Sequence, residues 1–143
     1  MSVLSGDAPK PATQFVAFDE HQQPYLVGSR CGTCEQLFPG SREHCASCCS
    51  RDCVDQTDLG TNGVLHSYTI VHRSYKGISV PFVSAVIDME GGGSVKGTLL
   101  DVEPVPEVLT FGMPVKVVFR CASCMNPEAE GYVSHFFVPA VDV

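Results

Sequence analysis

The sequence lacks long apolar runs, and it contains no tryptophan. Its unbroken apolar stretches are only a few residues long, whereas a helix needs ~20 apolar residues to cross a bilayer. We therefore expect no membrane-spanning segment and predict a soluble protein of the cytoplasm.

The first residues also lack the features of a secretory signal. The stretch MSVLSGDAPKPATQF has no basic start, no apolar core and no small-residue cleavage site. Disulfide bonds form mainly in oxidising compartments, so they are not the default interpretation of the eight cysteines. The spacing of these cysteines has to decide their role.

Positive charge is scarce as well. Nine Lys and Arg residues oppose 16 Asp and Glu residues, which gives a net charge of −7. Nucleic-acid binders draw most of their affinity from cationic contacts to phosphate. The charge balance therefore counts against DNA or RNA as the main partner.

Six of the eight cysteines lie between Cys31 and Cys53. Cys31 and Cys34 form one C-x-x-C pair, ten residues follow, and Cys45 and Cys48 form a second pair. A two-residue gap lets both sulfurs of a pair point at one ion from a tight turn, and the ten-residue gap suits a short β-hairpin. We predict one structural Zn²⁺, held by these two pairs in a rubredoxin-like zinc ribbon. Four thiolates leave no coordination position open for substrate or water.

The remaining cysteines leave alternatives open. Cys49 or Cys53 could replace the last ligand, and His44 is a further candidate; the regular spacing favours the set above and leaves both cysteines as free thiols. Cys121 and Cys124 form a third C-x-x-C pair, which looks like a dithiol redox motif. A thioredoxin-like site needs its first cysteine at a helix N-terminus, whereas this pair follows a predicted strand. We interpret the pair as hairpin-loop cysteines, with a loop disulfide as a lesser option.

From Gly60 onward, short segments rich in Val, Ile, Thr, Tyr and Phe are separated by Gly and Pro. They predict five strands, over residues 64–72, 81–89, 94–102, 114–121 and 132–140. The three glycines at 91–93 predict a hairpin turn, and residues 103–114 allow a single helical turn. Five strands with one short helical insertion after the third match a Greek-key barrel of the OB type. Alternation along the strands predicts these core residues: Val83, Ala85, Ile87, Met89, Val115, Val117 and Phe119.

The sequence thus predicts a mainly β chain in three parts. Residues 1–24 form an N-terminal arm with a possible short helix that ends before Pro24. Residues 25–58 form the four-cysteine zinc ribbon, and residues 59–143 form the OB-fold barrel. The ribbon segment has few branched apolar residues, so it cannot bury enough surface to fold without a further cross-link such as a bound metal ion.

The order of these features resembles the zinc-ribbon and OB-fold proteins of the domain of unknown function 35 family. The resemblance runs over residues 15–140 and rests on four segments. These are RCGTCEQLFPGSREHCASCCS, GVLHSYTIVHRS, PFVSAVIDMEGGGSVKGTLLDVEP and FGMPVKVVFR. Cys49 departs from the family pattern, which often has Gly at this position.

The resemblance implies a non-catalytic, zinc-binding accessory subunit of a thiolase-fold enzyme. Such a subunit is needed for assembly and for acyl-CoA binding during thiolytic or aldol-type C–C cleavage of a CoA thioester. Family partners include thiolases for aromatic substrates, such as benzoylsuccinyl-CoA thiolase, and the implied assembly is an α2β2 hetero-oligomer. The larger subunit would supply the nucleophilic cysteine. In this chain no nucleophile–base pair is evident, since the knuckle cysteines would hold zinc and His66 and His72 have no evident acid partner.

Residues 72–82, HRSYKGISVPF, join the first two predicted strands, a loop that OB folds often use for binding. Arg73, Tyr75 and Lys76 are candidates for contact with a CoA thioester bound jointly with the partner, or with the partner itself. A solvated loop is the alternative. The alternative function is a single-stranded nucleic-acid binder with the same barrel and ribbon, which would need basic residues interleaved with stacking aromatics.

Overall fold

The structure, a computed structural model, describes residues 10–40, 43–51, 55–124 and 131–140. Strands dominate these residues, and the helical content is two short 3-10 helices, η1 and η2. The predicted mainly β class is therefore confirmed. The described residues contain no candidate for a membrane-spanning helix, since η1 and η2 have three residues each.

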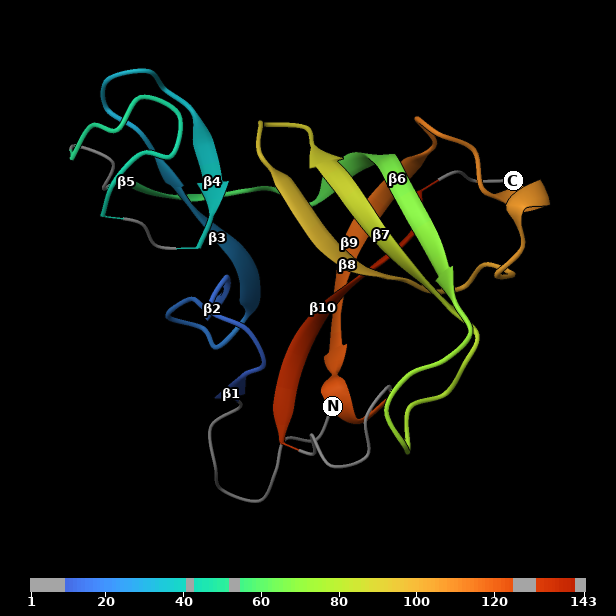
Figure 1. Cartoon of the computed structure of the whole chain (residues 1–143). Helices are drawn as coiled ribbons and strands as arrows, with labels where there is room; N and C mark the ends of the chain where they lie inside the picture. Colours follow the sequence, from blue (N-terminus) through green and yellow to red (C-terminus); the bar gives the residue numbers. More distant parts are fainter. Residues whose placement is uncertain (1–9, 41–42, 52–54, 125–130, 141–143) are drawn as a thin grey trace.

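The C-terminal strands close into a barrel (Figure 1). Its strands are β6 (Asn62–Val71), β7 (Phe82–Met89), β8 (Ser94–Leu99), β9 (Pro114–Cys121) and β10 (Tyr132–Pro139). The antiparallel pairs are β6–β7, β7–β8, β6–β9 and β9–β10, and the parallel pair β8–β10 completes the ring. The helix η1 (Pro106–Val108) follows the third of these strands. This order confirms the predicted OB-type barrel.

Alternation along the strands fills the barrel core as predicted. Every second residue of β7, from Val83 to Met89, is buried, and so are Val115 and Val117 on β9. Phe119 is only half-buried and packs against the core.

The largest fully buried side chain, Phe137, packs against Gly97 of β8. A Cβ atom added at Gly97 would come within 2.6 Å of the Phe137 ring. A side chain at Gly97 would therefore push β8 and β10 apart.

The ribbon is built around β3 (Pro24–Arg30), which has strand partners along its length. It pairs antiparallel with β2 (Val16–Phe18), β4 (Leu37–Pro39) and β5 (Asp55–Asp58). Cys31 directly follows β3, and Cys34 lies just before β4. The end of this hairpin therefore carries the first pair of candidate ligands.

The predicted short helix before Pro24 is wrong within the described residues. β1 (Lys10–Pro11) pairs parallel with β10, and β2 pairs with the first residues of β3. Between β2 and β3 the carboxylate of Asp19 accepts the backbone N–H groups of His21 and Gln23 at 2.8 and 2.9 Å. Gln22 there has a φ of 64°, which a helix does not allow. This turn and the pairing with β3 satisfy the backbone groups that a helix would have satisfied internally.

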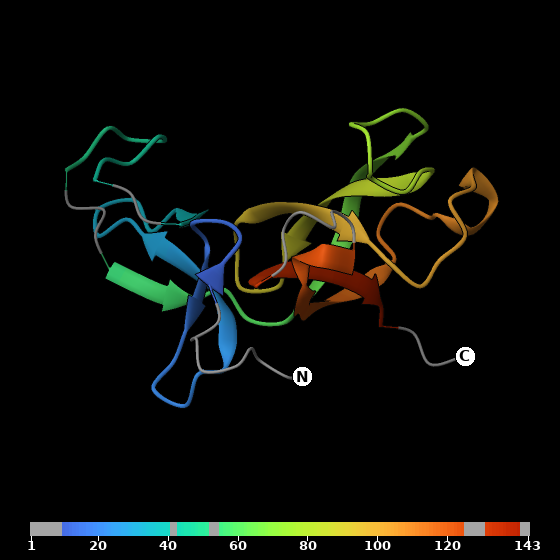
Figure 2. The same cartoon turned by 90° about the horizontal axis from the view of Figure 1, so that it is seen from below.

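The ribbon and the barrel lie side by side and share one hydrophobic core (Figures 1 and 2). Leu26, Leu37 and Leu59 belong to the same buried cluster as the barrel residues. The turn between β7 and β8 meets β4, because the Gly92 and Gly93 backbone lies against Leu37. The two parts are therefore joined by apolar packing as well as by the chain.

Candidate functional site

The four predicted zinc ligands come together at the end of the ribbon. The Sγ atoms of Cys31, Cys34, Cys45 and Cys48 all lie within 4.8 Å of one another. Cys31 Sγ lies 3.6 Å from Cys48 Sγ, and Cys34 Sγ lies 3.5 Å from Cys45 Sγ. A tetrahedral ion with Zn–S bonds of ~2.3 Å would place its sulfurs about 3.8 Å apart. The donor set therefore fits one tetrahedral metal ion such as zinc.

The two knuckles have the same backbone geometry. In the first, the N–H groups of Thr33 and Cys34 donate to Cys31 Sγ at 3.3 and 3.5 Å. In the second, the N–H groups of Ser47 and Cys48 donate to Cys45 Sγ at 3.3 and 3.4 Å. Backbone donors of this kind stabilise the thiolate form, which is the form that binds metal.

Cys49 occupies the same position after the second knuckle as Glu35 does after the first. Its N–H donates to the carbonyl of Cys45 at 2.9 Å, as the N–H of Glu35 does to the carbonyl of Cys31 at 3.0 Å. Both residues then turn the chain with a positive φ, 65° at Cys49 and 64° at Glu35. Glycine adopts this conformation at no steric cost, whereas other residues are strained there. Cys49 is thus the turn residue after the second knuckle, and its exposed side chain lies outside the group of four sulfurs.

The thiols of the cluster differ in acidity. The N–H groups of Cys34 and then Thr33 lower the pKa of Cys31 to about 6. The N–H of Cys48 is the largest influence that lowers the pKa of Cys45. The Ser50 N–H favours the Cys48 thiolate, but desolvation and the neighbouring sulfurs outweigh it and raise the pKa of Cys48 to about 12. A metal ion bound here would displace the protons that remain on the cluster.

The loop between β6 and β7 carries the other predicted site residues. Arg73, Tyr75 and Lys76 are all exposed, and Tyr75 is 85% exposed. The loop contains a turn in which the Ile78 N–H donates to the carbonyl of Tyr75 at 3.1 Å. Ile78 is half-buried, so the loop turns back onto the barrel just after the three predicted residues.

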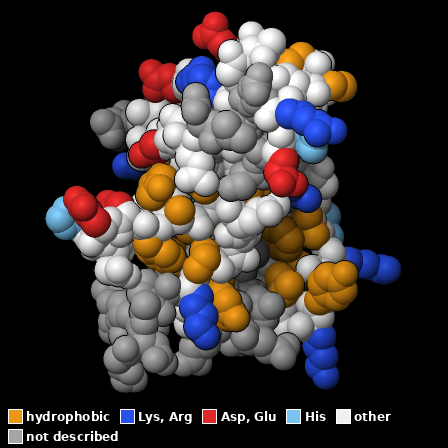
Figure 3. All heavy atoms as spheres, turned by 90° about the vertical axis from the view of Figure 1, so that its left-hand side faces the viewer, with side chains coloured by type: hydrophobic (Ala, Val, Ile, Leu, Met, Phe, Trp, Pro, Cys, Tyr) orange, Lys and Arg blue, Asp and Glu red, His pale blue; other side chains and the backbone are white. Residues whose placement is uncertain are grey.

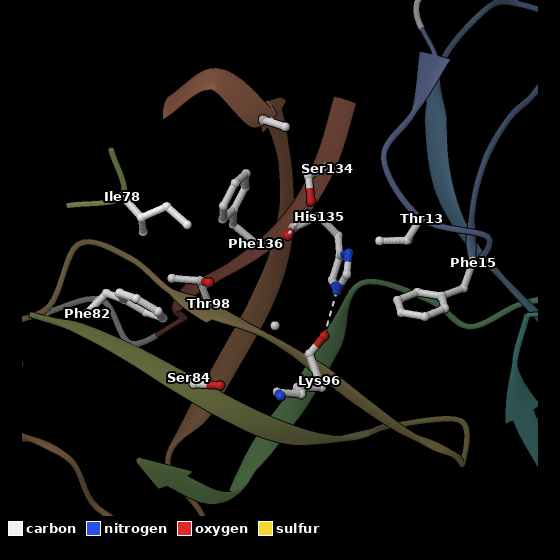
Figure 4. A pocket seen from close by; sticks show the side chains of 12 residues that line it. Thr13, Phe15, Ile78, Phe82, Ser84, Lys96, Thr98, Ser134, His135 and Phe136 are labelled. Atoms are coloured by element: carbon white, nitrogen blue, oxygen red, sulfur yellow. Dashed lines mark hydrogen bonds between the residues drawn. The ribbon is translucent and has the colours of Figure 1, made fainter. Parts of the chain in front are cut away.

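A groove on the barrel wall begins beside this loop (Figure 4). It has a volume of about 540 Å³, and its lining comes from the loop, from β7, β8 and β10, from Ala122 after β9, and from the arm. Ile78, Phe82 and Phe136 form one apolar end, and Phe15 lies toward the other. The polar side chains of the lining are Thr13, Ser84, Lys96, Thr98, Ser134 and His135. This groove could not be predicted from the sequence, because its lining combines strands that only the barrel brings together.

His135 is the buried polar residue of this groove. Its Nε2–H donates to the carbonyl of Lys96 at 2.7 Å, and its ring packs edge-on against Phe15 and Phe137. Desolvation lowers the pKa of His135, so the ring stays neutral. Within the described part of the chain, His135 Nδ1 and Thr13 Oγ1 are buried without a hydrogen-bond partner.

His66 has an acid partner that the sequence did not reveal. His66 is exposed at the register shift between Leu65 and Ser67, and its Nδ1 lies 2.9 Å from a carboxylate oxygen of Asp88. Ser94 donates to the other oxygen of Asp88 at 2.7 Å. The carboxylate stands between the hydroxyl and the imidazole, so this chain of hydrogen bonds is not a nucleophile–base pair.

Of the other predicted residues, His44 is exposed and lies outside the metal-binding group. Cys121 is half-buried, and its Sγ lies 3.0 Å from Ser123 Oγ in η2 (Ala122–Cys124). Cys53 and the side chain of Cys124 lie outside the described residues.

Apolar side chains gather across the middle of the face that the ribbon and the arm present (Figure 3). The elements on this side carry half-buried aromatic residues, among them Phe18, Tyr25 and Phe38. Charged side chains of both signs lie around this band. Contiguous apolar surface rimmed by polar residues is common at sites of protein contact.

Comparison with known proteins connects both halves of the chain to one family. The family profile described as "ChsH2, C-terminal OB-fold domain" matches residues 56–120. A DUF35 domain-containing scaffold protein of Methanocaldococcus jannaschii is 33% identical over 97 residues, which cover 66% of this chain and 67% of that protein. A protein of the same description from Methanothermobacter thermautotrophicus is 29% identical over 119 residues, which cover 81% of this chain and 86% of that protein.

A solved structure described as "Ltp2-ChsH2(DUF35) aldolase" is similar over most of the fold. The TM-score is 0.63 at 28% identity, and the match covers 82% of this chain and 86% of the other. A match of this extent reaches beyond the barrel, because the barrel strands begin only at Asn62. The arrangement of ribbon and barrel is therefore similar in the two proteins.

Proposed function

The chain belongs to the DUF35 family, and from this premise we propose that it is a non-catalytic, zinc-binding accessory subunit of a thiolase-fold enzyme. The observation that carries the proposal is the similarity over 82% of the chain to a DUF35 protein of a two-component aldolase. The relatives described as scaffold proteins support an assembly role. The partner would supply the catalytic groups for C–C cleavage of a CoA thioester by thiolysis or by an aldol-type reaction.

The chemistry of the metal centre fits this role. Four cysteine ligands would fill the coordination sphere of Zn²⁺, so the ion would rigidify the ribbon and take no part in the reaction. The apolar band on the ribbon side then offers a preformed surface for the larger subunit. A rigid surface lowers the entropic cost of association.

The loop between β6 and β7 is the proposed contact with the CoA thioester. Arg73 and Lys76 place two exposed cations on an acidic protein, and the exposed Tyr75 lies between them in the sequence. Cations of this kind suit the phosphates of coenzyme A. An exposed position also suits a ligand that is bound jointly by two subunits.

Purification of the tagged, zinc-loaded chain from its native source tests the subunit role. We expect mass spectrometry to find a thiolase-fold protein at a constant ratio. Co-expression of the two should give a complex of α2β2 mass by light scattering that cleaves acyl-CoA, while this chain alone is inactive. A thiolase-fold partner with full activity in the absence of this chain would contradict the proposal, as would recovery of nucleic acid in place of such a partner.

The double variant Arg73→Ala plus Lys76→Ala tests the CoA contact in that complex. Two exposed cation–phosphate contacts contribute ~0.5–1 kcal/mol each, so the KM for acyl-CoA should rise about tenfold with little change in kcat. Lys116→Ala is the matched control, because Lys116 is exposed on β9, outside the loop. An unchanged KM together with unchanged assembly would leave the loop as solvated surface.

A further inference from the structure

Three polar side chains stand together in the middle of the groove on the barrel wall (Figure 4). Ser84 on β7 is the register partner of Thr98 on β8, and Lys96 lies two residues before Thr98 on the same face of β8. All three point outward, away from the buried Val83, Val95 and Leu99. We call Ser84, Lys96 and Thr98 the polar triplet.

The charge around the polar triplet is unusual for this chain. The protein carries a net charge of −7, yet the groove lining contains Lys96 and no acidic residue. Within the described residues, the ion pairs involve other side chains, and Lys96 has none. His135 is the other titratable group of the lining, and its ring is held neutral by burial. The groove therefore has a single positive charge without a counter-ion.

The triplet is also rich in hydrogen-bond donors. An ammonium group offers three donors and no acceptor, and each hydroxyl can donate one hydrogen bond. Three donor groups on one face of the sheet, one of them positively charged, suit the two oxygens of a carboxylate. A phosphate dianion would call for a second cation, which the lining does not contain.

The walls beside the triplet are apolar and aromatic. Ile78, Phe82 and Phe136 lie at one end of the groove, next to Thr98 and Ser84. A volume of about 540 Å³ lies within the range of small-molecule sites, ~300–1,000 Å³. A ring or a branched chain packed there would bury its surface while its charged group faced Lys96.

We propose that this groove binds a small amphiphilic monoanion, a carboxylate on an aromatic or branched apolar body. The carboxylate accepts hydrogen bonds from the polar triplet, and the apolar body packs against Phe82 and Phe136. The site lies within this chain and does not rest on the accessory-subunit function. The loop residues Arg73 and Lys76, proposed to contact CoA, are outside its lining.

Phenylacetate and its neutral isostere phenylacetamide are the probes. Backbone amide shifts of the zinc-loaded full chain are followed by NMR as each probe is added. We expect saturable shifts with phenylacetate at the groove strands, and about fivefold weaker binding of phenylacetamide, as for one partly exposed charge pair. Equal binding of the two probes would overturn the proposal, and so would the absence of a saturable shift.

Two variants test whether Lys96 supplies the positive charge that binds the carboxylate. Lys96→Gln keeps a polar, exposed side chain and should weaken phenylacetate binding about fivefold, while binding of phenylacetamide stays the same. Lys116→Gln, on β9 outside the lining, should bind both probes as the wild type does. If Lys116→Gln weakens phenylacetate binding as much as Lys96→Gln does, the anion is held by the general surface charge and the proposal fails.

These outcomes are separate from those of the proposed function. Partner recovery and acyl-CoA cleavage are measured on the complex, whereas the probes are added to this chain alone. If the chain binds phenylacetate but no thiolase-fold partner is recovered, the groove proposal stands and the proposed subunit role fails. If a partner is recovered but phenylacetate does not bind, the subunit role stands and the groove proposal fails.

Discussion

The ribbon and the barrel of this protein are stabilised by different means. The barrel has a continuous core to which each of its five strands contributes fully buried apolar residues. The metal end of the ribbon has its own small cluster of Cys31 and Cys45, with Phe38 packed beside them. Burial of apolar surface at ~25 cal/mol per Å² can hold the barrel, whereas so small a cluster cannot repay the entropy of ordering its loops. The metal ion would replace a hydrophobic core at this end.

Leu37 connects the metal end of the ribbon to the barrel core. Leu37 follows the first knuckle by three residues, yet it is buried in the same cluster as the barrel residues. The stability of the metal end and that of the barrel should therefore be distinct but coupled.

Cys48→Ser should produce the largest difference between the two parts. Mutation of a residue that only hydrogen-bonds to a metal ligand lowers metal affinity by about 10- to 100-fold. Loss of one of the four thiolate ligands should therefore lower it by more than about 100-fold. Amide signals of residues 31–40 and 43–51 should then lose their dispersion, while those of β6–β10 persist, because the barrel core is intact. Metal content by mass spectrometry and NMR spectra check this together.

Cys49→Ser is the matched control for that experiment. Its side chain is exposed and lies outside the group of sulfurs, so one metal ion per chain should remain. Loss of metal from Cys49→Ser would mean that the second knuckle uses the other register. Global unfolding of Cys48→Ser would show that the barrel does not stay folded when the ribbon is disordered.

Truncation of core residues should have the next largest effect. Ile87→Ala removes a fully buried side chain from β7 and should lower the free energy of unfolding by about 3 kcal/mol. Leu37→Ala should cost about as much and should also weaken metal binding, because Leu37 connects the knuckle to the core. Urea unfolding and competition with a metal chelator measure the two quantities separately.

Val64→Ala serves as the control, since Val64 on β6 is 41% exposed. Its cost should stay below about 0.5 kcal/mol. If Leu37→Ala leaves metal affinity unchanged, the two parts are independent, and the shared cluster does not couple them.

The smallest effect concerns pH. Burial lowers the pKa of His135, so the unfolded chain binds the proton more readily than the folded chain. The stability that neutral His135 contributes is complete above the unfolded pKa of about 6.5, and it is lost as the pH falls through the folded pKa. We expect His135 to contribute up to ~1 kcal/mol to the fall in the free energy of unfolding between pH 7 and pH 5, measured as the difference between the wild type and His135→Gln.

His135→Gln should remove this contribution, because an amide can donate to the carbonyl of Lys96 and does not titrate. His66→Gln is the control: His66 is exposed beside Asp88, and this variant should keep the slope that His135 causes. A wild-type slope that survives in His135→Gln would assign the effect to other groups.

Much of the fold could be predicted because its signals are local. Each barrel strand has its own run of β-branched and aromatic residues, and the observed strands start and end within three residues of the predicted ones. The two knuckles could be predicted from spacing alone, since a C-x-x-C turn determines the positions of both sulfurs within a few residues.

The errors and omissions involve pairings that are distant in sequence. The helix predicted before Pro24 was wrong because residues 16–18 find their partners on β3, and propensity over so short a segment is easily overridden. The acid partner of His66 lies 22 residues away and reaches it only across the β6–β7 pair. The polar triplet likewise depends on the register of β7 against β8.

The sequence "RCGTCEQLFPGSREHCASCCSRDC" by itself determined that this protein has a candidate metal centre, since ligand type and spacing are local properties of the chain. It also determined the strand pattern of the barrel. The tertiary structure alone decided that Cys49 is a turn residue with a φ of 65°, that Leu37 joins the ribbon to the barrel core, and that Lys96 faces a groove without acidic residues. These features depend on backbone angles and on the register of strands far apart in sequence, and such contacts form only when the whole barrel closes.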